Sequence, residues 1–123
     1  PPALAAGMAT LDELERPGTF DRLLITSQRV AAGIERILTT EQMAVQVPRV
    51  GTVFSILFAN RSVRNYRDTL AADDERRRAL DLALLERGIF VKPGKPFYLS
   101  TAHDERAVRE TLVAFEEAVP DIT

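Results

Sequence analysis

The sequence has 123 residues and a formal net charge of −2, which fits one domain and gives no electrostatic reason for nucleic acid or an anionic membrane as the main partner. With no cysteine and a single histidine, it excludes disulfides, thiolate metal sites, a cysteine nucleophile and a histidine-rich metal cluster. The lack of cysteine suits the cytoplasm, and no apolar run approaches the roughly 20 residues that span a bilayer. The Pro-Pro start, with neither Met nor a basic signal-peptide region, leads us to expect a processed or excised fragment.

Two helices are predicted first. Residues 1–15 carry apolar side chains at three- and four-residue spacing, and Gly7 among them suggests close packing against another element. Pro17-Gly18 ends this helix, and Thr19 is a candidate N-cap for a second helix over residues 20–38. The second helix has one apolar stripe, made of Phe20, Leu23, Leu24, Val30, Ile34, Ile37 and Leu38.

From residue 44 the pattern changes to that of strands. Val45 and Val47 alternate with a polar residue, and residues 50–58 are rich in β-branched and aromatic side chains. Pro48 lacks an N–H donor and favours an edge or a bend, while Gly51 suggests a bulge. We therefore expect two short strands, or one broken strand, in this region.

A polar loop and a third main helix follow. Residues 60–70 carry three arginines and Tyr66, which form either a basic lip over an anionic ligand or partner domain, or a solvated loop paired with nearby acids. Asp73 is a candidate N-cap, and Gly88 ends the helix that it opens. The acids at residues 73–75 are better explained by capping and the helix dipole than by a cation, and residues Arg76 to Arg78 are interpreted as a solvated surface.

Residues 88–103 are the least generic stretch. Ile89–Val91 and Phe97–Leu99 are predicted as two strands around the Pro93-Gly94 turn. A polar segment, Ser100 to His103, then precedes a helix over residues 105–119 that Asp104 opens. Small polar side chains and free N–H groups at such a place can face an anionic ligand. Alternatively, Ser100 and Thr101 only cap the last helix and His103 is a surface residue.

These elements predict an α+β fold, in which about four helices pack on a small, mainly antiparallel sheet of three to four strands. We expect a single domain over residues 1–123, with residues 1–17 as a linking helix and residues 18–123 as the α+β core.

Little in the chain predicts catalysis. No glycine-rich phosphate loop is present, and Ser100, His103 and Asp104 lie too close together in sequence to converge as a triad. A Schiff base needs a desolvated lysine, whereas the only lysines, Lys92 and Lys95, flank a turn and are expected to be exposed. We therefore predict no catalytic residue and no metal site in this chain.

Five segments resemble one enzyme family in order along the chain. They are PPALAAGMATL at the start, Arg49-Val-Gly-Thr-Val-Phe54, Val63-Arg-Asn-Tyr66, Leu85-Glu-Arg-Gly-Ile89 and Tyr98-Leu-Ser-Thr-Ala-His103. In these segments the sequence resembles the C-terminal part of class III, fold-type I pyridoxal-phosphate (PLP) enzymes, especially the glutamate-1-semialdehyde aminomutase-like branch.

The resemblance implies a small C-terminal domain of a dimeric aminotransferase or aminomutase that acts on an amino-acid-type substrate. PLP and the aldimine lysine would belong to a large domain upstream, so this chain alone would bind no cofactor. Ser100, Thr101, His103 and Tyr98 would lie nearest the substrate. Many transaminases of the family have an Arg near the position of Tyr98 that binds the substrate carboxylate. Its absence here favours the aminomutase-like branch, although the Pro-Ser and Phe-Glu-Ala motifs of that branch are also missing.

The alternative is a free-standing α+β interaction or ligand-binding module without catalysis. An exposed apolar surface, including part of the first helix around Gly7, would favour a domain that packs on a larger one, whereas a polar and sealed surface would favour the module.

Overall fold

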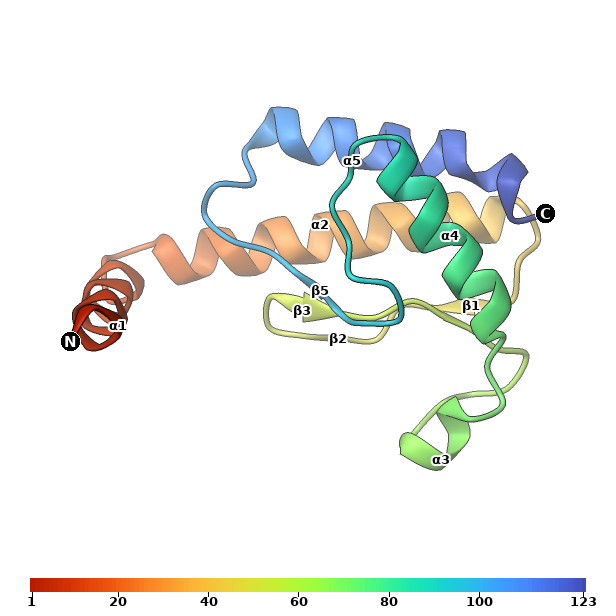
Figure 1. The fold of residues 1–123 in the computed structure, drawn as a ribbon, viewed down its shortest axis with the longest axis horizontal. Helices are drawn as coiled ribbons and strands as arrows, with labels where there is room; N and C mark the ends of the chain where they lie inside the picture. Colours follow the sequence, from red (N-terminus) through yellow and green to blue (C-terminus); the bar gives the residue numbers. More distant parts are fainter.

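The computed structural model describes all residues from 1 to 123, and its helices form the larger part of the fold. The four long helices are α1 (Pro2–Leu14), α2 (Thr19–Thr40), α4 (Asp74–Glu86) and α5 (Glu105–Ala118). A single turn, α3 (Tyr66–Thr69), and a final 3-10 helix, η1 (Val119–Asp121), complete them. Figure 1 shows α2 running between α5 on one side and the strands on the other, with α4 running obliquely from α5 toward the strands and α1 set apart at the N-terminal end.

The strands are short and form two antiparallel sheets. In the first, β1 (Val45–Gln46) pairs with β4 (Leu57–Phe58). In the second, the order is β2 (Arg49–Val50), β3 (Val53–Phe54) and β5 (Phe97–Tyr98). The α+β class with small antiparallel sheets is therefore confirmed.

Three details of the strand prediction were wrong, the first being that the region predicted to hold two short strands or one broken strand holds four, β1 to β4, divided between two sheets. Residues 89–91 do not form a strand, because the Ile89 N–H donates to the Leu84 carbonyl at 2.9 Å and closes the end of α4 instead of joining a ladder. Gly51 is not in a bulge: with φ of 60° it occupies the tight turn between Val50 and Val53, which pair directly across it. The Ser27 hydroxyl of α2 donates to the Gly51 carbonyl at 3.0 Å and holds this turn against the helix.

The core lies where α2, α4 and α5 meet the strands. It contains 19 buried apolar residues, and the most deeply buried large ones are Phe115, Ile34, Leu38, Ile56, Leu80 and Leu84. The apolar stripe predicted for α2 is largely buried, although Phe20 at its start is exposed. Gly33 lets α5 approach closely, since a Cβ at this position would lie 2.7 Å from Leu112 Cδ2. The apolar periodicity predicted which faces of the helices are buried, and close contacts such as this one fix how the helices pack together.

The helix starts test the capping predictions. Asp73 and Asp104 are N-caps as predicted, accepting from Arg76 N at 2.9 Å and from Ala107 N at 2.8 Å. Thr19 is not a cap: Gly18 takes that position with φ of 81°, and Thr19 is buried in the first turn. Since Asp104 caps α5, Ser100 and Thr101 do not have the capping role that was one interpretation of them.

Helix α1 is the least integrated element. None of its residues is buried, and the apolar side chains of its stripe are exposed: Leu4, Met8, Leu11 and Leu14. Nothing in this chain lies within 4 Å of a Cβ placed at Gly7, so any close packing there involves atoms outside the chain. No helix in the structure has the length and hydropathy of a membrane span.

Candidate functional site

The polar segment between β5 and α5 folds into a tight turn around His103. The Ser100 N–H donates to His103 Nδ1 at 3.0 Å, and the Ser100 hydroxyl lies 3.2 Å from the same nitrogen. The His103 N–H closes the turn on the Ser100 carbonyl at 3.1 Å. Because Nδ1 accepts from a backbone N–H, the proton of the neutral imidazole lies on Nε2, which can donate away from the turn.

The same turn does not form a catalytic triad. Asp104 Oδ1 accepts from the Ala107 N–H, and no hydrogen bond joins the Asp104 carboxylate to His103. Ser100 is exposed and His103 is only half-buried, so neither has the water-excluding surroundings of an activated nucleophile. Thr101 is exposed, and its side chain makes no hydrogen bond. The structure therefore brings Ser100 and His103 together and leaves Thr101 at the surface.

Tyr98 and His103 meet at a cavity of about 570 Å³ next to this turn. Tyr98 lies on β5, opposite Val53 of β3, and its side chain is 68% exposed. Ser100 and Thr101 do not line the cavity. Of the four residues predicted near the substrate, two therefore lie at a concave surface and two lie on the adjacent turn.

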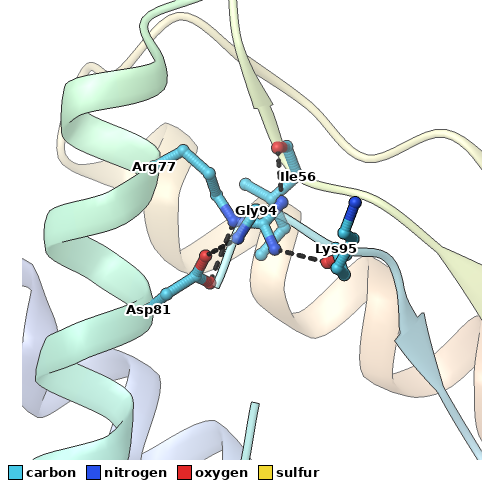
Figure 2. A network of polar contacts seen from close by, with 5 residues as sticks. All are labelled: Ile56, Arg77, Asp81, Gly94 and Lys95. Carbon is cyan, nitrogen blue, oxygen red and sulfur yellow. Dashed lines mark hydrogen bonds and ion pairs between the residues drawn. The ribbon is translucent and has the colours of Figure 1, made fainter. Parts of the chain in front are cut away.

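A buried ion pair holds the loop that leads into β5. Arg77 Nε donates to Asp81 Oδ1 at 2.9 Å, and the guanidinium also donates to the carbonyls of Ile56 at 3.0 Å and Lys95 at 2.8 Å. The second Asp81 oxygen accepts from the Gly94 N–H at 2.7 Å. Figure 2 shows these partners converging from α4, β3–β4 and the turn before β5. The pair thus fixes the 93–95 turn and, with it, one border of the cavity.

This network corrects the interpretation of Arg76 to Arg78 as a solvated surface. Arg77 is 8% exposed and Asp81 is 0% exposed, and the guanidinium carbon of Arg77 lies 4.9 Å from the centre of the Phe97 ring. The sequence carried one signal for it: Arg77 and Asp81 are four residues apart, on the helix face that also carries the core residues Leu80 and Leu84.

The basic loop has no acidic partners. Its three arginines, Arg61, Arg64 and Arg67, are exposed and take part in no ion pair. The interpretation of a solvated loop whose arginines pair with nearby acids is therefore wrong about the pairing. Within it, Asn65 caps α3 through a capping box with Asp68, a helical turn that the sequence interpretation treated as loop. Whether this loop contacts a ligand or a partner domain stays a prediction.

The polar groups of this chain do not fit a complete PLP site. Lys92 and Lys95 are both exposed on the turn before β5, whereas an aldimine lysine is held desolvated. The buried Arg77 and Asp81 are already committed to each other and to backbone groups. No group of three or more His, Asp or Glu side chains is arranged to hold a metal ion.

No protein-family model matches the chain, but individual known proteins are similar to it. It is 34% identical over 124 residues to glutamate-1-semialdehyde 2,1-aminomutase from Desulfosudis oleivorans, covering 99% of this chain and 29% of that protein. The Methanopyrus kandleri protein of the same name is 33% identical over 125 residues, covering 100% of this chain and 29% of its own length. The chain thus spans less than a third of the length of these curated relatives.

Solved structures agree on the fold. A glutamate-1-semialdehyde-aminomutase from Pseudomonas aeruginosa PAO1 superposes with a TM-score of 0.84 at 21% identity, over 98% of this chain and 27% of that one. An omega-transaminase from Sphaerobacter thermophilus gives a TM-score of 0.72 at 28% identity, over 86% of this chain and 25% of that one. The chain therefore matches, over almost its whole length, the C-terminal part of glutamate-1-semialdehyde 2,1-aminomutases, and it has the fold of the corresponding domain of PLP transaminases.

Proposed function

We propose that this chain serves as the small C-terminal domain of an enzyme that transfers amino groups with PLP, of the glutamate-1-semialdehyde aminomutase type. The observation that carries the proposal is the end-to-end match: 99% of the chain aligns with 29% of the Desulfosudis oleivorans aminomutase. The remaining length of such an enzyme supplies the large domain, with the cofactor and its aldimine lysine. In this chain both lysines are exposed.

The proposed role of this domain is to close one side of the substrate site. Tyr98 and the Ser100–His103 turn supply the polar groups nearest the substrate, and His103 Nε2 is the donor that the turn leaves available. The Arg77–Asp81 pair keeps the preceding turn in place, so that β5 delivers these side chains at a fixed position. Helix α1 supports an interdomain contact, since its exposed apolar stripe covers nothing within this chain.

The assembly and location follow from the same proposal. The intact enzyme forms a homodimer in the cytoplasm and acts on an amino-acid-type substrate. The complete lack of cysteine supports a reducing compartment. Sedimentation of the intact enzyme tests the dimer directly, and a monomer with full activity would contradict it.

Substitution in the intact enzyme tests the site. S100A and H103A should each lower kcat/KM for glutamate-1-semialdehyde by about tenfold, the cost of one lost hydrogen bond to a charged group. The matched control is S62A. Ser62 is exposed on the loop that carries α3, and Figure 1 shows α3 well away from β5. Unchanged kinetics in both site variants would remove Ser100 and His103 from the substrate site.

The cofactor assignment has its own test on the isolated chain. Titration with PLP, followed by hydride reduction and mass mapping, should give no saturable, stoichiometric adduct, because both lysines are exposed and lack the desolvated surroundings of an aldimine lysine. A stoichiometric adduct on Lys92 or Lys95 would show that this chain holds its own cofactor.

A further inference from the structure

The cavity beside the Ser100–His103 turn is built mainly from core side chains. Buried core side chains lie beneath it, namely Val30 and Ile34 of α2, Phe54 of β3 and Phe115 of α5, and the accessible apolar lining is Ile89, Phe90, Phe97 and Leu99. Ten of its fifteen lining residues are apolar, and its volume of about 570 Å³ is that of a small-molecule pocket. The interior therefore favours an apolar body.

The charged groups at the cavity are all basic. Lys92 and Lys95 line it, and no Asp or Glu does. Neither lysine takes part in an ion pair anywhere in the structure. The Lys95 carbonyl is held by the Arg77 guanidinium at 2.8 Å, and Figure 2 shows its ammonium pointing away from the Arg77–Asp81 pair. The backbone of this lysine is thus fixed while its charge is free for a ligand.

Two further side chains at the cavity add to the same preference. His103 lines it, and because its Nδ1 accepts from the Ser100 N–H, its Nε2–H is left as a donor. Phe90 also lines the cavity and is 91% exposed, so it offers an aromatic surface to an entering molecule. The cavity is mainly apolar, carries hydrogen-bond donors and cations, and lacks acids. These features complement an anion with an apolar body.

We propose that this cavity binds an amphipathic monocarboxylate, with its aryl or alkyl body against Ile89, Phe90, Phe97 and Leu99 and its carboxylate at Lys92, Lys95 and His103. This site lies wholly within the chain and shares Tyr98 and His103 with the surface that the proposed function places nearest the substrate. Its ligand needs no aldehyde and no amino group, so its failure and the failure of the proposed function are separate results.

The test is a titration of the 123-residue chain with 4-phenylbutyrate, followed by amide NMR shifts and calorimetry. We expect saturable binding with a dissociation constant on the order of 1 mM or tighter. The shifts should be centred on residues 89–99 and the 100–103 turn. Two control ligands separate the contributions: 4-phenylbutanol keeps the apolar body without the charge, and acetate keeps the charge without the body. Both should bind at least about fivefold more weakly.

Two double variants that each remove two positive charges test the lysines. K92M/K95M removes two exposed cations at the cavity, and R61M/R64M removes two exposed cations from the basic loop. The lysine variant should weaken 4-phenylbutyrate binding by about tenfold, because each exposed ion pair contributes up to about fivefold. The arginine variant should stay within about twofold of the parent. Circular dichroism checks that both fold, as expected for surface positions.

Three results would overturn the proposal. The first is an absence of saturable binding by the parent chain. The second is binding of the alcohol as tight as that of the acid, which would show that the lysines play no part. The third is an equal loss in the two double variants, which would make the effect one of overall charge and not of this cavity.

Discussion

Replacing Asp81 by alanine should be one of the most costly single changes in this chain. The Asp81 side chain is fully buried and accepts from Arg77 Nε at 2.9 Å and from the Gly94 N–H at 2.7 Å. In D81A the Arg77 guanidinium keeps only the carbonyls of Ile56 and Lys95 as partners, so its charge stays buried without a counter-charge. The Gly94 N–H loses its acceptor at the same time.

The expected loss in free energy of unfolding is about 4 kcal/mol. Breaking a buried ion pair by removing one partner costs roughly 3–5 kcal/mol, and the Gly94 N–H adds little because it is only partly buried and water can reach it. A domain of this size has a total stability of about 5–15 kcal/mol, so D81A should leave it folded but marginal.

Urea unfolding followed by far-UV circular dichroism measures this loss, and the chain offers a matched control. Arg106 and Glu110 of α5 also lie four residues apart with an N–O distance of 2.9 Å, but their side chains are 76% and 59% exposed. E110A should therefore cost less than about 0.5 kcal/mol. If D81A and E110A differ by less than about 1 kcal/mol, burial does not strengthen the first pair and the argument is wrong.

A double-mutant cycle isolates the pair itself. R77M alone leaves the Asp81 carboxylate buried without its cation, and R77M/D81A leaves neither charge. We expect the double variant to be at least about 2 kcal/mol more stable than the sum of the two single losses predicts. Simple additivity would show that Arg77 and Asp81 act independently.

Two further predictions concern a helix cap and the N-terminal helix. D104A should lower the free energy of unfolding by about 1 kcal/mol, because Asp104 Oδ1 caps the Ala107 N–H. D104N should lower it by only a few tenths of a kcal/mol, since asparagine caps as well as aspartate. Thermal unfolding compares the two variants, and equal losses would contradict the capping role. Removal of residues 1–17 should change the stability of the rest by less than about 1 kcal/mol, since no residue of α1 is buried. A larger loss in urea unfolding would show that α1 is part of the core.

Much of the fold could be predicted from local patterns. The stripes of α2 and α5, the caps at Asp73 and Asp104 and the glycine after α4 each depend on residues that are close together in sequence. The errors have equally local causes. Ile89 has the composition of a strand residue, but its N–H is used to close α4, and Thr19 has the chemistry of a cap, but Gly18 precedes it in a left-handed conformation.

The candidate site shows a similar division. The sequence drew attention to Tyr98, Ser100, Thr101 and His103, and the structure pairs only Ser100 with His103 and sets Tyr98 and His103 at one cavity. From the sequence, Lys92 and Lys95 are predicted only to flank a turn. Their place at the cavity could not be predicted, because no nearby residue indicates which helices the turn faces.

The sequence by itself determined the α+β class, most helix boundaries and the resemblance to PLP enzymes, since these rest on composition, periodicity and short motifs. Only the tertiary structure decided that Arg77 is buried, because besides Asp81 its guanidinium binds the carbonyls of Ile56 and Lys95, which lie 21 and 18 residues away in the sequence. The cavity likewise depends on the packing of α2, β5 and α5, which are distant in sequence. Burial and electrostatic pairing are properties of the assembled fold, and no local pattern fixes them.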